Sequence, residues 1–393
     1  MEFERSFVKV IAKRLQEPRR FIQIIMGPRQ TGKSTAAAQA LSHLDCPIVQ
    51  FSFDRPLDRR LEKLDEIWKQ AREVEKQHGD AVLLLDEIQK VPQWSNGVKS
   101  LWDEDTRNQR NLRVLITGSS ALMLQSGLTE ALTGRFEIEY STHWSLWECM
   151  QAFDYSLDDF LYFGGYPGAA VLKNDEGRWF DYMRNSIVDP TLSQDVLELE
   201  DIRKPALLRA LYEVGAMFSS QEISYRKILG QLDDKGNTET IAHYLDLLSN
   251  AGLLTGLKKY SDKLLVSKSS SPRMLVHDTS LMVAASGEDR ATLLEDPDRR
   301  GHLVETAIGA YLLARSHNEH FDVYWWREGT AEVDFVIRKG RKRTAIEVKS
   351  GRPKRTKGLG EFVTRFPGTY SLIVGSAEFP IEDFLLGRVP LFQ

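Results

Sequence analysis

The chain has 393 residues, of which 42% are hydrophobic and 27% charged, and its formal net charge is −4. This length exceeds the usual single domain of about 100–200 residues, so we expect two or three domains, and the small net charge indicates neither a nucleic-acid-binding nor a membrane-binding class. Two cysteines, Cys46 and Cys149, form neither a disulfide framework nor a zinc-ligand spacing. The sequence shows no basic signal peptide and no apolar run of about 18–20 residues, which predicts a cytoplasmic protein without membrane contact.

Short apolar runs alternate with helical patterns in the first third of the chain. The runs span residues 21–26, 47–53, 81–85, 113–116 and 136–140. The run Ala-Val-Leu-Leu-Leu shows no alternation of apolar and polar residues, which is typical of a strand buried on both faces. This order predicts an α/β fold in which helices cover a parallel sheet.

A phosphate-binding pattern follows the first of these runs. The pattern G-x-x-x-x-G-K-[ST] is matched in full by Gly27, Pro28, Arg29, Gln30, Thr31, Gly32, Lys33 and Ser34. An Ala-rich helix follows, and its residue Thr35 is also assigned to the nucleotide site. We expect the loop backbone to surround the phosphates of ATP, Lys33 to reach the β- and γ-phosphates, and Ser34 to bind Mg²⁺. The sequence therefore predicts a P-loop with ATP and Mg²⁺ as its cofactors.

Two acids end the run 81–85. Asp86 is expected to hold the Mg²⁺ of the ATP site through water, and Glu87 to orient and polarise the attacking water. An Asp-Glu pair that merely ends a strand is the alternative. The strand-like run 47–53 lies between the two motifs, which is compatible with an acidic strand set apart from the P-loop strand, as in ATPases that use a catalytic glutamate.

Two further candidates follow the run 113–116. Ser119, or Thr117 beside it, is expected at the tip of a strand, where a polar side chain contacts the γ-phosphate or the water; a Gly-Ser-Ser turn without a catalytic role is the alternative. Arg135 is a candidate arginine finger, because a guanidinium can neutralise the charge that develops on the transferred phosphoryl group. The alternative is a surface arginine.

The region 205–267 predicts three helices followed by a two-stranded wing, the pattern of a winged helix-turn-helix. Four lysines suit contact of the wing with DNA phosphates: Lys258, Lys259, Lys263 and Lys268. The third helix carries the acids Glu239 and Asp246 and few base-reading side chains. A packing module between the ATPase and the tail is therefore the alternative to a DNA-binding module.

Carboxylates and a lysine follow in the C-terminal region on two strand-like runs, 332–337 and 344–349. If the two strands pair, Asp334 lies beside Glu347 and Lys349, and Glu305 on an upstream helix adds a third carboxylate. Such a group could bind Mg²⁺ or Mn²⁺ and activate a water. The stretch 338–357 also holds ten Lys or Arg residues against one acid, which suits phosphate binding. A solvated hairpin with a surface Glu–Lys ion pair is the alternative.

These segments together resemble a known family. They comprise the P-loop and three further segments, which are Leu-Leu-Leu-Asp-Glu-Ile-Gln-Lys-Val-Pro, Leu-Thr-Gly-Arg-Phe and Gly-Gly-Tyr-Pro. These four segments look like those of prokaryotic AAA-type ATPases with a C-terminal domain of unknown function. The resemblance implies an AAA+ core with a helical lid over residues 1–200, a winged helix over 201–270 and a restriction-endonuclease-like domain over 271–393. The group Asp334, Glu347 and Lys349 resembles the Asp…Glu-x-Lys signature of such nucleases, although Val333 replaces the proline of that motif.

Three functions remain in competition at this point. The first is an ATPase coupled to DNA, with a metal-dependent nuclease-like tail. The second is a nucleotide-controlled switch that binds a protein partner and has no nuclease activity, and the third is a transcription regulator that binds DNA without cutting it. The resemblance is also compatible with a homo-oligomer, in which a neighbouring subunit supplies an arginine.

Overall fold

The computed structural model describes residues 3–119, 124, 128, 131–196, 202, 204–231, 237–261, 271–351 and 357–393. The chain divides into two compact units, Met1–Thr142 and His143–Gln393. The boundaries predicted at 200 and 270 fall on residues outside the described ranges, so the three-domain division stays a prediction. The helices predicted as a lid of the first domain, however, belong to the second compact unit.

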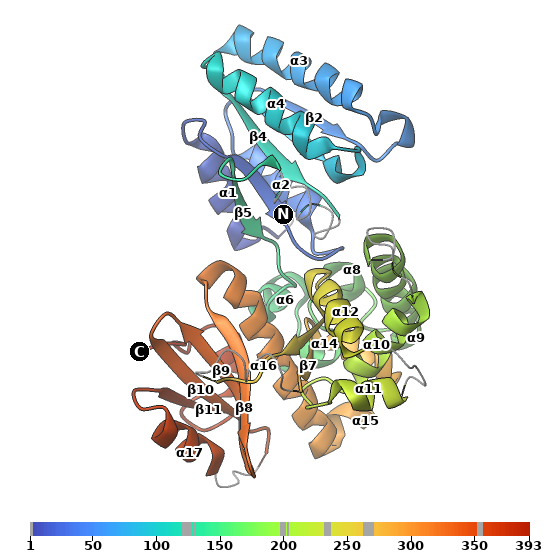
Figure 1. The fold of residues 1–393 in the computed structure, drawn as a ribbon, viewed down its shortest axis with the longest axis vertical. Coiled ribbons are helices and arrows are strands. Elements are labelled where there is room, and N and C mark those ends of the chain that lie inside the picture. The colour runs from blue at the N-terminus through green and yellow to red at the C-terminus, as the bar shows by residue number, and fades with distance from the viewer. Residues whose placement is uncertain are drawn as a thin grey trace. The chain divides into compact units, whose positions relative to one another are not determined.

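The first unit is built on a five-stranded parallel sheet (Figure 1). Its strands, in spatial order, are β2 (Ile48–Ser52), β3 (Ala81–Asp86), β4 (Leu112–Thr117), β1 (Ile22–Met26) and β5 (Phe136–Tyr140). All five lie on the apolar runs that predict them. Strand β4 separates β1 from β3, so the acidic strand is set apart from the P-loop strand as predicted.

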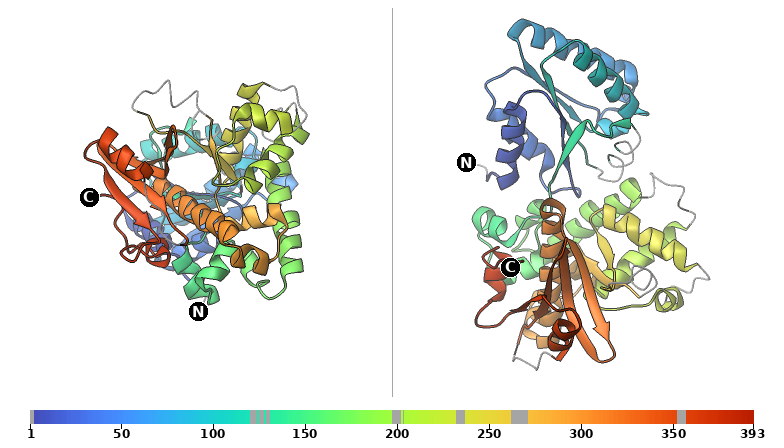
Figure 2. Two further views of the ribbon diagram at one scale, coloured as in Figure 1. Left: turned by 90° about the horizontal axis from the view of Figure 1, so that it is seen from below. Right: turned by 60° about the vertical axis from the view of Figure 1, so that its left-hand side comes forward.

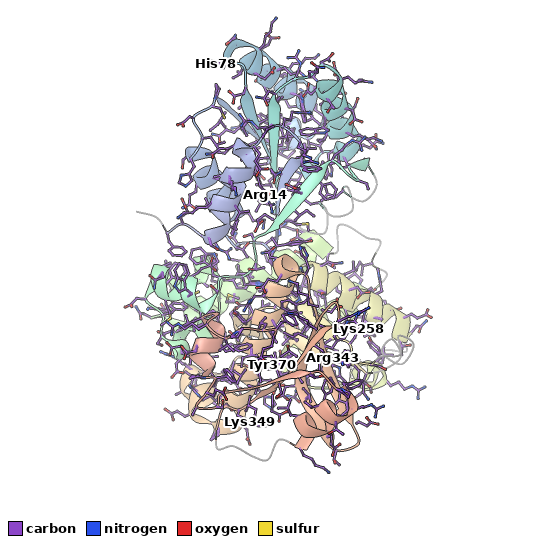
Figure 3. All side chains as sticks on the ribbon, turned by 90° about the vertical axis from the view of Figure 1, so that its left-hand side faces the viewer. Arg14, His78, Lys258, Arg343, Lys349 and Tyr370 are labelled. Atoms are coloured by element: carbon purple, nitrogen blue, oxygen red, sulfur yellow. The ribbon has the colours of Figure 1, made fainter. Side chains whose placement is uncertain are left out.

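Helices cover both faces of this sheet, which explains why β1 and β4 are buried throughout. Helices α3 (Leu61–His78) and α4 (Trp94–Arg107) pack on one face, and α1 (Ser6–Gln16) and α2 (Lys33–Ser42) pack on the other (Figure 1). Two short 3₁₀ segments, η1 (Pro56–Asp58) and η2 (Ile88–Lys90), join helices to strands. In Figure 3, Arg14 marks α1 and His78 marks the end of α3.

The second unit opens with helices whose first turns the sequence specifies. Ser145 and Glu148 form a capping box at α6, and Ser156 and Asp159 form one at α7. The helices are α6 (Leu146–Phe153), α7 (Leu157–Phe163), α8 (Pro167–Ala170), α9 (Glu176–Tyr182), α10 (Pro205–Met217), α11 (Tyr225–Gln231), α12 (Thr238–Asn250), α14 (Thr279–Ser286), α15 (Arg290–Glu295), α16 (Pro297–Glu319), α17 (Lys357–Arg365) and α18 (Ile381–Leu385). After α9 the chain continues through two π-helical segments, η3 (Met183–Val188) and η4 (Thr191–Val196).

The three helices predicted for the middle region are confirmed as α10, α11 and α12. Strand β6 (Leu254–Leu257) follows them and pairs antiparallel with β7 (Arg273–Val276), which lies beyond the range predicted for the wing. Residues 262–270, with Lys263 and Lys268, lie outside the described residues.

A second sheet of four strands closes the chain (Figure 2). Its spatial order is β11 (Tyr370–Val374), β10 (Lys342–Val348), β9 (Ala331–Lys339) and β8 (Asp322–Glu328). The predicted pairing of the two carboxylate-bearing strands is confirmed, because β9 and β10 run antiparallel with Phe335 opposite Ile346. This register brings the next residues along the pair, Asp334 and Glu347, to the same end of the hairpin.

Candidate functional site

The P-loop joins β1 to α2, as its sequence requires. Gly27 is enclosed so tightly that a Cβ atom there would lie 2.1 Å from the carbonyl oxygen of Ser141. Gly32 caps α2 with φ at 88°, a conformation that glycine adopts without strain. The buried Lys33 ammonium donates to the carbonyl of Gly27 at 3.0 Å and to that of Pro28. The predicted loop residues are therefore held together as one backbone cradle, with the Ser34 and Thr35 side chains exposed at the start of α2.

A buried arginine fastens this loop to the end of β5. Arg5 donates to the carbonyl of Thr31 at 3.3 Å, to the hydroxyl of Ser141 at 3.1 Å and to the carbonyl of Thr142 at 2.9 Å. The Thr31 hydroxyl also lies 3.2 Å from that of Ser141. Sequence reasoning missed Arg5 and Ser141, because neither belongs to the P-loop pattern and their contacts span many residues of chain.

The acids predicted at the end of β3 lie beside the end of β4. The Thr117 hydroxyl donates to Asp86, so Thr117 supports Asp86. Burial raises the pKa of the Asp86 carboxyl, and the hydrogen bond from Thr117 opposes that rise. Ser34 and Asp86 supply the oxygen donors that Mg²⁺ prefers.

Glu87 is the most constrained acid of this site. Its backbone is left-handed, with φ at 57°, which is strained for a non-glycine residue. Its carboxylate accepts from the Ser119 backbone N–H at 2.7 Å, the Ser119 hydroxyl at 2.9 Å and the Gln89 amide at 2.9 Å, and the Lys90 ammonium lies 2.8 Å away. Lys90 also contacts Asp54 at 2.7 Å. The structure thus brings the predicted base Glu87 and the predicted sensor Ser119 into direct contact.

Gly118 makes room for this network, since a Cβ atom there would lie 2.3 Å from the Gln89 side-chain oxygen. The sequence analysis assigned no role to Gln89 or Lys90. Their position in the sequence could have identified them, because both lie one helical turn or less after Glu87, within reach of its carboxylate.

Arg135 is not brought to the P-loop within the chain. It precedes β5, whose residue Phe136 lies opposite Ile22, so Arg135 lies at the amino ends of the strands, whereas the P-loop follows their carboxyl ends. Its guanidinium binds both carboxylate oxygens of Asp103, at 2.7 and 3.0 Å. That hydrogen-bonded ion pair raises the pKa of Arg135. A catalytic role of Arg135 would have to be exerted on the site of another subunit.

The C-terminal carboxylates also converge, in the second unit. Asp334 accepts a hydrogen bond from the backbone N–H of Val348 at 2.7 Å, and Lys349 donates to Glu347 at 2.6 Å. Figure 3 shows Lys349 and Arg343 at opposite ends of β10. Glu305 comes from α16, so three elements contribute, as predicted. We call Glu305, Glu332, Asp334 and Glu347 the carboxylate cluster.

An arginine that the sequence analysis did not single out lies among these acids. Arg273 on β7 donates to Glu305 and to the carbonyl of Asp334 at 3.1 Å, and it forms ion pairs with the carboxylates of Glu332 at 3.4 Å and Asp334 at 3.7 Å. Its side chain is only 6% exposed. The available signal was an arginine inside the apolar run Arg-Met-Leu-Val, because a buried arginine requires acidic partners.

Burial governs the titration of these acids. It raises the pKa of Glu305 to about 8 against the opposing charge of Arg273, and it raises the pKa of Asp334 and of Glu347. No group of three or more His, Cys, Asp or Glu side chains in the described part of the chain is arranged to hold a metal ion. The metal site predicted on Glu305, Asp334, Glu347 and Lys349 therefore does not fit a divalent ion in this arrangement.

The segment predicted as the wing is hydrogen-bonded to the C-terminal sheet. The Tyr260 N–H donates to the Trp325 carbonyl at 2.6 Å, and the Trp325 N–H donates to the Lys258 carbonyl at 3.2 Å. Tyr260 is buried and accepts from Arg343 at 2.8 Å. These contacts favour the packing role that the sequence left open, although the Lys258 side chain stays exposed.

Comparison with known families agrees with this geometry. An AAA domain matches residues 19–149, which span the P-loop, β3 and Arg135. The domain of unknown function DUF8612 matches residues 154–292, and the domain of unknown function DUF4143 matches residues 300–391. The chain therefore contains an AAA domain followed by two domains of unknown function. The family predicted from the sequence is thereby confirmed.

Similar proteins match this chain over most of their own length. An uncharacterized protein of Haemophilus influenzae is 25% identical over 86% of this chain and 84% of its own, and one of Mycobacterium tuberculosis is 23% identical over 95% and 80%. Among solved structures, the ORC2 protein of Aeropyrum pernix, in complexes with ADPNP and ADP, covers 75% of this chain and 96% of its own at 11% identity and a TM-score of 0.45. A RuvB variant of Thermotoga maritima covers 63% and 85% at 15% identity and a TM-score of 0.33.

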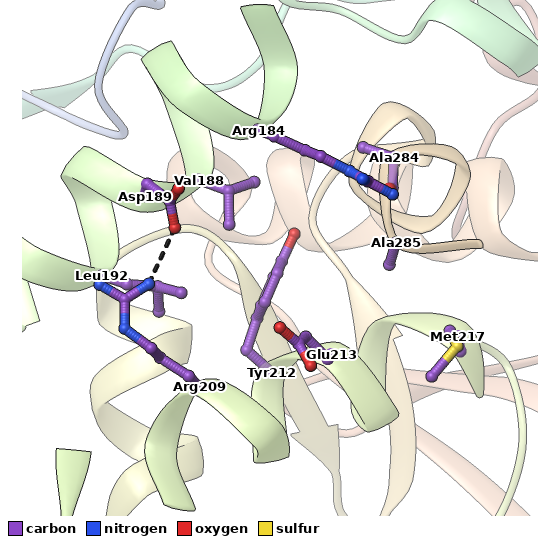
Figure 4. A pocket seen from close by; sticks show the side chains of 10 residues that line it. All are labelled: Arg184, Val188, Asp189, Leu192, Arg209, Tyr212, Glu213, Met217, Ala284 and Ala285. Atoms are coloured by element: carbon purple, nitrogen blue, oxygen red, sulfur yellow. Dashed lines mark hydrogen bonds and ion pairs between the residues drawn. The ribbon is translucent and has the colours of Figure 1, made fainter. Parts of the chain in front are cut away.

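The second unit of this ATPase also contains a cavity of about 390 Å³ between η3, η4 and α10 (Figure 4). Arg209 and Asp189 pair across its wall at 2.8 Å, and Arg184 donates to the Ala284 carbonyl at 3.2 Å. The buried Tyr212 hydroxyl has no hydrogen-bond partner among the described residues. Because the cationic walls already have partners, the lining does not favour one class of ligand.

Among the helices that the structure describes, none combines the length and the apolar character needed to cross a bilayer.

Proposed function

We propose that the first unit binds ATP with Mg²⁺ in the P-loop and hydrolyses it, with Glu87 as the general base. Lys33, the loop N–H groups and the start of α2 supply the positive field for the phosphates. Ser34 and Asp86 would hold Mg²⁺, which supplies charge neutralisation at the phosphates when bound. Phosphoryl transfer depends mainly on such positioning and electrostatics, which this loop provides.

Glu87 would take the proton of the attacking water. Its carboxylate accepts from Ser119, Gln89 and Lys90 in this structure, so it must exchange one of these donors for water before it can act as a base. Ser119 then keeps the carboxylate aligned through its backbone N–H. The single observation that carries this assignment is the contact between Glu87 and Ser119 across the ends of β3 and β4.

The test uses two variants of the full chain. Lys33→Ala is expected to abolish binding of a fluorescent ATP analogue, because the loop loses its ammonium. Glu87→Gln is expected to bind ATP as the wild type does and to lose turnover by about 100-fold or more. Glu66→Gln, at an exposed acid of α3, is the matched control and should leave both unchanged. Normal turnover by Glu87→Gln would refute the role of Glu87.

We further propose, as a second candidate, that the second unit contacts DNA phosphates without reading bases. Supporting it is a basic face at the β9–β10 hairpin, where the side chains of Lys339, Arg341 and Lys342 are exposed. Arg343 of the same hairpin donates to Tyr260, and Lys258 lies near Arg343 in Figure 3. Helix α12, with its acids and no Lys or Arg, gives no support for reading of bases.

Salt dependence tests this candidate. Wild-type affinity for a labelled duplex should fall steeply with salt, and replacing Lys339, Arg341 and Lys342 by Ala should lower the log–log slope by roughly two to three. Replacement of three exposed lysines elsewhere, Lys13, Lys69 and Lys76, is the control for net charge. Absence of binding at low salt would leave the alternative function, a nucleotide-controlled switch that binds a protein partner.

A further inference from the structure

Arg273 places a fixed positive charge where the C-terminal carboxylates converge. We infer that this guanidinium is a built-in cation that takes the place of a divalent metal ion in the carboxylate cluster, so that the cluster stabilises the domain and does not support metal-dependent cleavage. The inference is independent of the proposed ATPase activity, because Arg273 and all its partners lie in the second unit.

The contacts of Arg273 use the oxygens that a metal ion would need. One terminal nitrogen binds Glu305, and the other lies 3.4 Å from Glu332 and 3.7 Å from Asp334. The second oxygen of Asp334 already accepts from the Val348 N–H at 2.7 Å. One oxygen of Asp334 therefore accepts from the backbone and the other faces the guanidinium, which also binds Glu305.

Lys349 completes the neutralisation from the other side. It donates to one oxygen of Glu347 at 2.6 Å, and the remaining oxygen of Glu347 is buried without a hydrogen-bond partner among the described residues. One such oxygen does not supply the several ligands that a divalent ion needs. The Lys349 ammonium on Glu347 and the Arg273 guanidinium on the other carboxylates of the cluster would both repel a divalent ion.

Arg273 is held in place by its own strand. Its Nε donates to the carbonyl of Ser220 at 2.8 Å, and β7 pairs with β6. The guanidinium also lies 5.9 Å from the centre of the Phe335 ring. Departure of Arg273 would remove the cation that binds Glu305 and would leave Asp334 with the charge of Lys349 alone, so displacement of the guanidinium carries a large free-energy cost for these buried acids.

The test measures Mn²⁺ binding by the full chain through the electron paramagnetic resonance signal of free Mn²⁺. The background carries Asp86→Asn, so that the ATP site contributes no ion. In this background the carboxylate cluster should bind no Mn²⁺. Binding curves up to about 1 mM Mn²⁺ should therefore be the same with and without the added Asp334→Asn substitution. Uptake of one ion that Asp334→Asn abolishes would overturn the inference.

The opposite experiment removes the guanidinium and tests whether the cluster then binds Mn²⁺. In the same background, Arg273→Met is expected to gain about one Mn²⁺ per chain, and added Asp334→Asn should abolish that gain. A folded Arg273→Met protein that still binds no ion would show that the arginine does not exclude it and would also overturn the inference. Near-ultraviolet circular dichroism reports folding; if Arg273→Met fails to fold, the comparison with Asp334→Asn still decides.

Discussion

Ser119 holds the carboxylate of Glu87 at both oxygens, with its backbone N–H 2.7 Å from one and its hydroxyl 2.9 Å from the other. The two residues follow neighbouring strands, β3 and β4, whose carboxyl ends meet at one edge of the sheet. Strand pairing therefore sets the position of the base relative to the P-loop. Glu87 also has a strained, left-handed backbone, and the bonds from Ser119 are among the contacts that hold its carboxylate in place.

The first prediction concerns the Ser119 hydroxyl. Ser119→Ala removes one hydrogen bond to a charged group, which is typically worth about 1.5–3 kcal/mol, so we expect kcat to fall about 10-fold or more. The KM for ATP should stay unchanged, because Ser119 does not belong to the nucleotide cradle. Steady-state kinetics checks this, and Ser119→Thr, which keeps a hydroxyl, should retain most of the activity. A fall in kcat equal for both variants would contradict the role of the hydroxyl.

The second prediction concerns a residue of the loop's support. Arg5→Met removes the donors that tie Thr31 to the end of β5, and we expect ATP affinity to fall roughly 10-fold, about 1.4 kcal/mol, although Arg5 has no role as a ligand. Isothermal titration with a non-hydrolysable ATP analogue measures it. Lys13→Met, at an exposed position of α1, is the control, and equal affinities of the two variants would argue against this support.

The sequence predicted the proposed catalytic groups, but it did not predict the residues that hold them in place. Lys33, Asp86 and Glu87 are read from local patterns, because strand–loop–helix geometry fixes the position of each residue. Arg5 and Arg273 act through partners that are distant in sequence, and no local pattern specifies such pairs. The acids of the metal site predicted on Glu305 and Asp334 converge as their spacing predicts, but Arg273 from a different strand forms ion pairs with both, which their spacing did not predict.

The strands and helices also differ in this way: local patterns were predicted from the sequence, and long-range contacts were not. Short apolar runs predicted β1 to β5, and this local signal is clearest in β3, whose continuous apolar residues are buried on both faces of the sheet. The partner of β6 was not predictable, because a four-residue antiparallel strand takes its register from tertiary packing, here from β7 and the contact of Tyr260 with Trp325. From the sequence, the helices after His143 were assigned to the first domain. In the structure the Gly165 N–H donates to Asp278, 113 residues away, a contact that no local pattern predicts.

The third prediction concerns Arg135, which can act only on another subunit. If it does, Arg135→Ala should lower turnover by about 1000-fold without changing ATP affinity. Mixing it with Lys33→Ala, which keeps Arg135 but binds no ATP, should restore turnover that neither variant shows alone. Arg107→Ala, at an exposed arginine of α4, is the control. If the mixture restores no turnover and Arg135→Ala alone is fully active, Arg135 has only a structural role as the partner of Asp103.

The fourth prediction explains the glycines of the Gly-Gly-Tyr-Pro segment. Gly164 has φ at 68°, and a Cβ atom there would lie 1.8 Å from a carboxylate oxygen of Asp278. We expect Gly164→Ala to destabilise the second unit by roughly 2–4 kcal/mol, measured by calorimetry. Gly230→Ala, where the helix α11 leaves open space, should be neutral or stabilising by up to about 1 kcal/mol. Equal melting temperatures for both variants would refute this account.

The last prediction concerns the pH dependence that Asp278 introduces. Asp278 caps α14 and accepts from the N–H groups of Ser280 at 3.0 Å and Gly165 at 2.7 Å, but burial raises its pKa from the usual 3.8 to about 6. The native carboxyl therefore holds its proton more tightly than the unfolded chain does. Its contribution to stability is complete below about pH 4 and is lost as the pH rises through about 6, a change of about 3 kcal/mol.

Asp278→Asn isolates this contribution, because the amide oxygen still accepts hydrogen bonds and does not ionise. Calorimetric unfolding of both proteins between pH 4.5 and 7.5 should show the wild type losing stability relative to Asp278→Asn as the pH rises. The titration of other acids is common to both proteins and cancels in the difference. Stability curves that stay parallel across this range would show that the hydrogen bonds from Gly165 and Ser280 fully offset the burial of the charge.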